Sequence, residues 1–354
     1  MSSSEKPMIA LAMGDPAGIG AELAARLLAD QDIADAADVL LIGDRRVLAL
    51  GERQAGIEGS VPDLDGFAEH GQCLADLGHL DPADIEVGQS SVAGGDFALV
   101  NFRVALKMAA AGIADAVAFT PFNKHSMRLA EEDYVDEIGF IKRTIGAAKD
   151  GSEFNILEEV WNARVTSHIP LSEVASHITP ERIEKAIDLT LESMQAVGFE
   201  RPRLAVAGLN PHAGDGGNFG REEIEIIEPA VRAAADRQLA VEGPFSPDTV
   251  FLRAQAGLHD AVLTMYHDQG QIAMKLMGFD RGITLIGGYP FPITTPAHGT
   301  AFDIAGQGKA NPEASKRALL IGADMASQFA GDDGFPDRVT RIEAVRGFFR
   351  GGRA

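Results

Sequence analysis

Residues 261–275 read AVLTMYHDQGQIAMK, an apolar run of strand length that is followed at once by a histidine, an aspartate and a lysine. In α/β proteins ligands bind at the carboxyl ends of parallel strands, because side chains there leave the packed sheet. The stretch therefore predicts a buried strand that carries titratable groups at its end, which makes it a candidate site.

Apolar segments of strand length alternate with amphipathic segments of helix length along most of the chain. MIALAMG precedes the helical AELAARLLAD, and DVLLIGD precedes RRVLALGER. Helical DFALVNFRVALKMAAAG then leads into DAVAFT, ERIEKAIDLTLESMQAVG into RLAVAGLN, and EEIEIIEPAVRAAADRQ into HDAVLTMY. This alternation predicts an α/β fold with a mostly parallel sheet and helices on both faces. Residues 58–89 lack periodicity and are expected to form loops or an excursion from the sheet. The last residues are expected to form a short helix with a frayed basic end.

Composition limits the classes of protein. A chain of 354 residues with 45% hydrophobic residues is long enough for two domains. No apolar run approaches the ~20 residues that span a bilayer, and no signal peptide is visible, so we expect a cytoplasmic protein without a membrane partner. The formal net charge of −21 disfavours nucleic acid as a partner. A single cysteine, Cys73, excludes an intrachain disulfide.

Four segments rich in glycine or polar residues interrupt the alternation. GDPAGIG at residues 14–20 precedes a helix and is either an anion cradle or a tight structural turn, since its spacing is not that of a Rossmann fingerprint. TPFNK at 120–124 places a lysine after an apolar strand. The remaining two are NPHAGDGGNFG at 210–220 and HGTAFDIAGQGKANP at 298–312, and the latter is suited to wrapping a flat ligand.

Three histidines follow three apolar runs: His168 in NARVTSH, His212 in RLAVAGLNPH and His267 in AVLTMYH. Three imidazoles at strand ends could hold a catalytic divalent cation and leave positions open for water or substrate. Their long spacing is not in itself a metal signature, and solvated or structural histidines are the alternative.

Taken together, these segments resemble the 4-hydroxythreonine-4-phosphate dehydrogenase family. The resemblance rests on GDPAGIGAEL, TPFNK, GLNPHAGDGGNFGREE, GPFSPDTVF, DAVLTMYHDQGQIAMK and HGTAFDIAGQGKANP, which occur in this order over nearly the whole chain. It implies two α/β/α domains of the isopropylmalate dehydrogenase type, with the active site in the interdomain cleft at the interface of a homodimer. The first domain would comprise residues 1–128 and 290–354, and the second residues 129–289.

The resemblance also implies an NAD-dependent dehydrogenase that oxidises a secondary alcohol of a small-molecule substrate with one divalent cation per active site. The metal ligands of the family match His168, His212 and His267, and its substrate-contacting lysine matches Lys275. The loop HGTAFDIAGQGKANP resembles the adenosine-binding loop of isopropylmalate and isocitrate dehydrogenases. The cofactor-binding residues expected on it are His298, Gly299, Thr300, Asp303 and Asn311.

The sequence departs from the family at the substrate-binding positions. Glu137 and Ile138 stand where the family has histidine and threonine, and Thr284 and Ile293 where it has asparagine and arginine. Phosphate prefers arginine, histidine and N–H donors, which these residues do not provide. We therefore expect a changed, non-phosphorylated substrate, such as a hydroxy acid or an aromatic dihydrodiol carboxylate.

The expected chemistry is oxidation of a hydroxyl whose pKa is lowered by the cation, with hydride transfer to NAD. Lys275, Asp268 and Asp248 are the candidate catalytic residues, and decarboxylation could follow if the product is a β-keto acid. Zn, Mg, Co and Mn are not distinguished, nor is NAD from NADP.

Three alternatives stay open. The chain could be a true 4-hydroxythreonine-4-phosphate dehydrogenase of pyridoxal phosphate synthesis, a phosphate acyltransferase-like enzyme on a related fold, or a metabolite-binding protein without activity.

Overall fold

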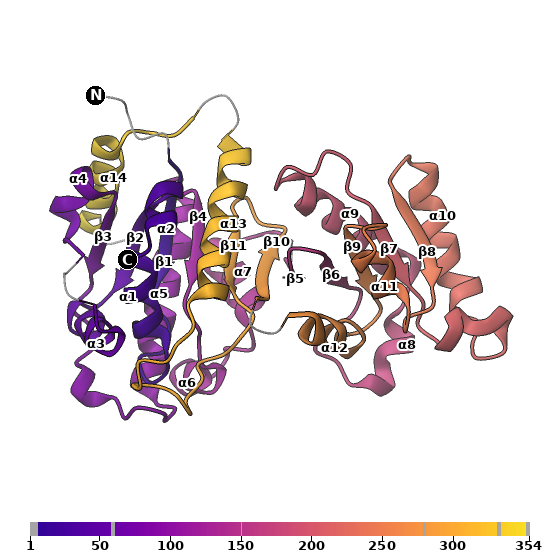
Figure 1. The fold of residues 1–354 in the computed structure, drawn as a ribbon, viewed down its shortest axis with the longest axis horizontal. Coiled ribbons are helices and arrows are strands. Elements are labelled where there is room, and N and C mark those ends of the chain that lie inside the picture. The colour runs from indigo at the N-terminus through magenta and orange to yellow at the C-terminus, as the bar shows by residue number, and fades with distance from the viewer. Residues whose placement is uncertain (1–5, 58–60, 150, 279–280, 331–333, 352–354) are drawn as a thin grey trace. The chain divides into compact units, whose positions relative to one another are not determined.

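The structure is a computed structural model and describes residues 6–57, 61–149, 151–278, 281–330 and 334–351. The chain divides into two compact units, which Figure 1 shows as ribbons. Unit 1 comprises residues 1–151 and 289–354, and unit 2 comprises residues 152–288.

The observed division differs from the domain boundary expected after residue 128. Residues 129–151 belong to unit 1. Helix α7 (Glu137–Ile145) explains the difference, because its Phe140 stacks on Phe102 of helix α5 (Val92–Ala110) with ring centroids 5.5 Å apart. Such a contact between distant segments is not visible in hydrophobic periodicity.

Unit 1 is built on parallel strands in the order β3-β2-β1-β4-β11. Their bounds are β1 Met8–Ala12, β2 Asp38–Gly43, β3 Gln72–Asp76, β4 Ala116–Phe119 and β11 Ile293–Pro296. β1 and β2 are buried at every position, as expected of parallel strands covered on both faces.

Helices cover both faces of this sheet (Figure 1). Ala116 and Ala118 of β4 share a core with Leu319 of helix α13, whereas Phe119 meets Phe102 of α5, as alternation along a strand requires. The remaining elements of unit 1 are α1 Gly20–Leu28, α2 Gln31–Ala36, α3 Arg45–Ala55, η1 Leu64–Gly66, α4 Phe67–His70, η2 Pro82–Asp84, α6 Lys124–Ala130, α13 Glu313–Ala330 and α14 Arg338–Arg350.

Unit 2 has the strand order β10-β5-β6-β9-β7-β8. β10, β5 and β6 pair antiparallel, and β6, β9, β7 and β8 pair parallel. The strands are β5 Ser152–Ile156, β6 Trp161–Arg164, β7 Leu204–Ala207, β8 Val241–Phe245, β9 Ala261–Thr264 and β10 Ile283–Gly287. The helices are η3 Leu171–Glu173, α8 Val174–His177, α9 Pro180–Gln195, η4 Pro211–Gly217, η5 Glu223–Ile227, α10 Glu228–Asp236, α11 Val250–Gln255 and α12 His267–Gly278.

The α/β alternation predicted from sequence is confirmed, including the C-terminal helix, which forms α14. The expectation that residues 58–89 form loops or an excursion from the sheet is wrong at β3, a short strand that pairs with β2 in the sheet, and at helix α4. Residues 58–60 lie outside the described residues. The middle residues of β3, Cys73, Leu74 and Ala75, are buried, but a strand of five residues that begins with glutamine and ends with aspartate gives too short a pattern to recognise. Within the described residues, no helix combines the length and hydropathy required to cross a bilayer.

The aromatic cluster in unit 1 generates a stability prediction. Phe102 is fully buried and contacts the rings of Phe119, Phe122 and Phe140. Phe102→Ala is expected to lower the free energy of unfolding by ~3–5 kcal/mol, because the cavity cannot close around three fixed rings. Phe329→Ala, at a position that is 50% exposed, should cost far less. Urea unfolding measures both, and equal costs would contradict the assigned cluster.

Candidate active site

The three histidines follow three neighbouring parallel strands of unit 2. His168 comes after β6, His267 after β9 and His212 after β7, and these strands lie in the order β6-β9-β7. The parallel pairing brings the carboxyl ends of all three strands to one edge of the sheet.

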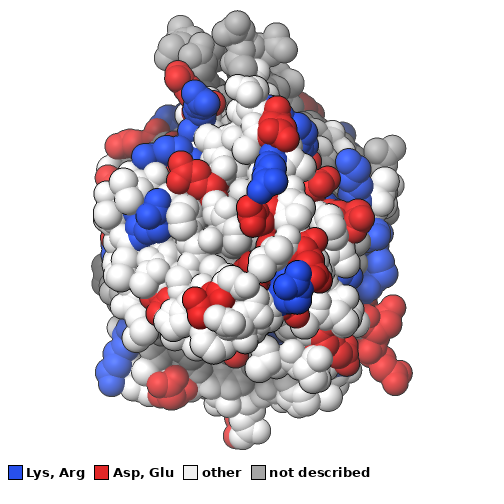
Figure 2. All heavy atoms as spheres, turned by 90° about the vertical axis from the view of Figure 1, so that its right-hand side faces the viewer, with Lys and Arg blue, Asp and Glu red and all other residues white. Residues whose placement is uncertain are grey.

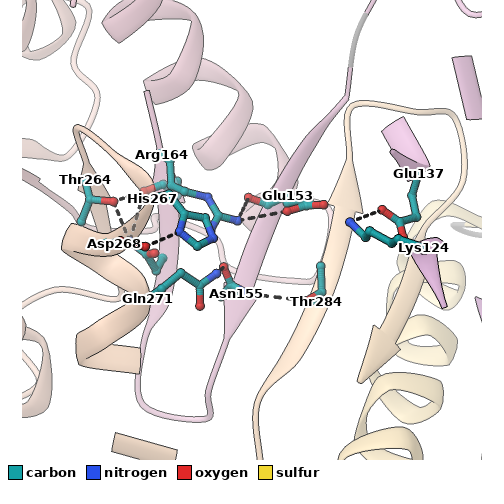
Figure 3. Close-up of polar contacts among 12 residues, drawn as sticks. Lys124, Glu137, Glu153, Asn155, Arg164, Thr264, His267, Asp268, Gln271 and Thr284 are labelled. Atoms are coloured by element: carbon teal, nitrogen blue, oxygen red, sulfur yellow. Dashed lines mark hydrogen bonds and ion pairs between the residues drawn. The ribbon is translucent and has the colours of Figure 1, made fainter. Parts of the chain in front are cut away.

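His267 is held in an orientation that suits a ligand. Its Nδ1 lies 2.6 Å from Oδ1 of Asp268, so Nδ1–H donates to the carboxylate and the lone pair stays on Nε2 (Figure 3). The ring centroids of His267 and His168 are 5.6 Å apart. In the described part of the chain, no three His, Cys, Asp or Glu side chains are grouped so as to hold a metal ion. The structure thus brings two of the three histidines together.

His212 lies in a turn of unusual backbone conformation. Residues 212–216 all have positive φ, with values of 55°, 49°, 80°, 44° and 62°. His212, Ala213 and Asp215 adopt this left-handed region although they carry a Cβ, which is costly. The buried Glu223 carboxylate braces the start of the turn, since Oε1 accepts the N–H groups of Leu209 and Asn210 at 2.8 and 2.7 Å.

Gln269 joins two of the three strand ends and was not among the residues expected from sequence. Its Oε1 accepts the N–H of Met265 at 2.7 Å, and its Nε2 donates to the carbonyl of Gly208 at 2.8 Å. These bonds connect the segment before His267 to the segment before His212. The glutamine in the motif YHDQG was the sequence feature that could have indicated this residue.

A polar row, also missed, crosses unit 2 close to the N-terminal half of α12 (Figure 3). Gln271 donates to Asn155 at 2.6 Å, and Asn155 donates to Oγ1 of Thr284 at 3.4 Å. Arg164 lies 3.4 Å from Glu153, and burial lowers the pKa of its guanidinium. Thr284, the expected substrate contact, therefore belongs to a hydrogen-bonded group.

The remaining expected catalytic residues are both exposed. Lys275 lies on α12, two turns after His267. Asp248 accepts a hydrogen bond from the hydroxyl of Ser246 at 2.6 Å.

Of the substrate positions expected in unit 1, Glu137 is engaged in an ion pair. Glu137 is buried, and its Oε2 lies 2.8 Å from Nζ of Lys124, the lysine of TPFNK (Figure 3). Burial, together with the adjacent Glu137 carboxylate, raises the pKa of Tyr134. The carbonyl of Ile138 accepts a hydrogen bond from Tyr289 at 3.2 Å, and Ile293 is fully buried in β11.

The expected cofactor loop lies in unit 1 between β11 and α13. His298 Nδ1 is 3.1 Å from the carbonyl of Gly299, and burial lowers the pKa of this histidine. Thr300 is buried and Asp303 exposed. Asn311 Oδ1 accepts the N–H of Glu313, the first residue of α13, at 3.0 Å.

The segment GDPAGIG forms a tight structural turn in unit 1. Gly14 N–H donates to Thr120 Oγ1 at 2.8 Å, and Ala17 N–H to the buried Asp15 carboxylate at 2.8 Å. A Cβ at Gly14 would lie 2.3 Å from the carbonyl oxygens of Thr120 and Pro121. With these N–H groups occupied and a carboxylate at its centre, the turn does not favour an anion.

Comparison with known proteins gives three findings. Residues 35–322 match the family described as pyridoxal phosphate biosynthetic protein PdxA. The chain is 55% identical over 332 residues to a Rhizobium meliloti (strain 1021) protein named "Putative 4-hydroxythreonine-4-phosphate dehydrogenase 2", covering 92% of this chain and 95% of that one. It is also similar to the 4-hydroxythreonine-4-phosphate dehydrogenase of Klebsiella pneumoniae, at 35% identity and a TM-score of 0.79, covering 92% and 99% of the two chains.

A second solved structure carries a different name. It is the terephthalate 1,2-cis-dihydrodiol dehydrogenase of Burkholderia xenovorans LB400, with 28% identity, a TM-score of 0.63 and coverage of 89% of this chain and 98% of that one.

The family match covers most of the chain, and the relatives that match it along nearly their whole length are named as dehydrogenases. The chain belongs to the PdxA family and is a dehydrogenase, an oxidoreductase that acts on a CH–OH group.

Proposed function

We propose that the protein is a metal-dependent, NAD-linked dehydrogenase that oxidises a secondary alcohol of a small, non-phosphorylated hydroxy acid. The observation that carries the proposal is the placement of His168, His212 and His267 after three adjacent parallel strands. Neutral imidazoles are a suitable donor set for a catalytic divalent cation, and the Asp268 contact already fixes the tautomer of one of them.

A cation held by these histidines would lower the pKa of a substrate hydroxyl and so favour its deprotonation near neutral pH. Lys275 follows His267 on the same helix and is proposed to orient a substrate carboxylate. Asp268 is better suited to positioning His267 than to acting as a base, because its carboxylate is already engaged. Asp248 stays a candidate base, and loss of CO2 is proposed as a second step where oxidation yields a β-keto acid.

We propose that a homodimer completes the histidine set. Two of the three rings lie near one another within one chain, and α12, which begins at His267, exposes Ile272 and Leu276 by 62% and 83%. Large aliphatic side chains this exposed beside a polar site suit a subunit interface.

NAD is proposed to bind at residues 298–311. Support comes from the small side chains of this loop and its irregular backbone, which let a flat ligand approach closely. His298, Gly299, Thr300, Asp303 and Asn311 are the proposed contacts.

The proposed change of substrate rests on the residues around Glu137. The Glu137 carboxylate would repel phosphate, and the Lys124 ammonium beside it is already engaged in an ion pair. The solved structure named as a terephthalate 1,2-cis-dihydrodiol dehydrogenase, which is 28% identical to this chain, supports this proposal. The second candidate is a phosphorylated hydroxy acid, which the names of the more similar relatives favour.

The metal assignment predicts a larger loss of cation affinity for one substitution and a smaller loss for another. His212→Ala should remove most of the bound divalent cation, because two ligands hold a catalytic cation poorly. Asp268→Asn should weaken cation binding by ~10–100-fold, since the partner of a ligating histidine tunes its orientation and basicity. Calorimetric titration with Zn²⁺ measures both. Asp248→Asn serves as the control, and full cation affinity in His212→Ala would refute the assignment.

The ion pair in unit 1 predicts an asymmetry in stability. Lys124→Met should lower the free energy of unfolding by ~1–3 kcal/mol, because it leaves the buried Glu137 carboxylate without its cation. Glu137→Gln should cost less, since the Lys124 side chain is 43% exposed and can be hydrated. Urea unfolding at pH 7.5 compares them, and a greater cost for Glu137→Gln would contradict the arrangement.

Substrate choice is tested by steady-state kinetics. Without two or three charge-assisted phosphate contacts of ~1.5–3 kcal/mol each, kcat/KM for 4-hydroxythreonine 4-phosphate should be about two to six decades below that of a family member that has them. Carboxylated dihydrodiols and simple hydroxy acids should be preferred. Thr284→Asn is expected to recover part of the phosphate activity. Efficient, metal-dependent oxidation of the phosphorylated compound by the parent chain would establish the second candidate instead.

A further inference from the structure

Helix α1 and the loop at residues 298–311 are joined through a buried carboxylate. Glu22 on α1 is fully buried. Its Oε1 accepts hydrogen bonds from Nε and Nη2 of Arg26, at 3.0 and 2.8 Å, and from the backbone N–H of Ala310 at 3.0 Å. One oxygen atom thus binds both its own helix and the loop.

Arg26 holds the loop at a second point. Its Nη2 also donates to the carbonyl of Gly308, at 3.0 Å. The pair Glu22 and Arg26 therefore binds one backbone acceptor and one backbone donor of the loop, 282 and 288 residues further along the chain. We call this pair the loop anchor.

The other end of the loop is fixed to the turn that precedes α1. Ile19 N–H donates to the carbonyl of Thr300 at 3.0 Å, and a Cβ at Gly18 would lie 2.6 Å from that same oxygen. Ile19, Leu23 and Ala310 form a small apolar cluster between the two segments. The turn GDPAGIG and the start of α1 thus form the support on which the loop lies.

A buried carboxylate is costly unless it is paired and hydrogen-bonded, and here the bonds that compensate it include one to the loop. Oε2 of Glu22 has no hydrogen-bond partner among the described residues. The loop itself is mostly turns, so its conformation depends on such external contacts. Glu22 therefore affects the position of the loop as well as the stability of α1.

We propose that Glu22 and Arg26 are positioning residues that keep the loop in its cofactor-binding conformation. The inference rests on the proposed binding of NAD at this loop. If the loop leaves that conformation, the apparent Kd equals the intrinsic Kd divided by the competent fraction. Loss of the anchor should therefore raise the Kd and the KM for NAD and leave kcat at saturating NAD nearly unchanged.

The test combines hydrogen exchange of residues 298–311 in the free protein, calorimetric titration of NAD, and initial rates at varied NAD, which give KM and kcat. Glu22→Ala should speed exchange in the loop and raise the Kd by about tenfold, as expected if the competent fraction falls to about one tenth. Glu22→Gln keeps an acceptor for the N–H of Ala310. Its loop exchange rate and its Kd for NAD should therefore lie between those of Glu22→Ala and those of the parent. The control is Glu228→Gln, which removes an exposed Glu–Arg pair of the same i,i+4 spacing on α10.

Unchanged loop exchange and unchanged Kd in Glu22→Ala would overturn the proposal, as would an equal fall in kcat and rise in KM. If Glu22→Ala does not fold, Arg26→Met, which retains the buried acid, is measured in the same way. A parent chain that binds no NAD would refute the proposed cofactor, and the exchange experiment alone would then decide whether the anchor orders the loop.

Discussion

The candidate site depends on the parallel pairing of β6, β9 and β7. Register partners such as Arg164 with Thr264, and Val206 with Leu263, bring three strand ends to one edge. A slip of one residue would turn every side chain of a strand to the opposite face. Buried Asn162 holds the β6–β9 register, because its Nδ2 donates to the carbonyl of Val262 and to Thr264 Oγ1 at 3.1 and 3.2 Å.

Two polar side chains, one buried and one partly buried, also fix the loops that bear the histidines. Glu223 braces the strained turn of His212, and Gln269 connects the segments before His212 and His267. These groups are satisfied by backbone atoms, so their removal would leave buried N–H or C=O groups unpaired. Stability and site geometry are thus coupled in unit 2.

On the face in Figure 2, acidic and basic side chains are interspersed rather than gathered into a field of one sign.

Local patterns predicted much of this from the sequence. The long amphipathic helices and the buried strands were recognisable because each shows its hydrophobic pattern over its whole length. The positions of the three histidines, each after an apolar run, followed from the strands so predicted. Contacts between distant segments were not recognisable. Nothing near Glu137 indicates that its carboxylate meets Lys124, and nothing near Glu22 indicates that it accepts the N–H of Ala310. The extent of unit 1 beyond residue 128 likewise depends on the packing of Phe140 on Phe102.

The central claim is that these strand ends hold one divalent cation on three imidazoles. Crystals grown with Zn²⁺ and measured at the zinc absorption edge test it most directly. We expect one anomalous peak per subunit, ~2.0–2.1 Å from a nitrogen of each of His168, His212 and His267, with the partner's histidines counted. A peak bound by other side chains, or none at these histidines, would contradict it.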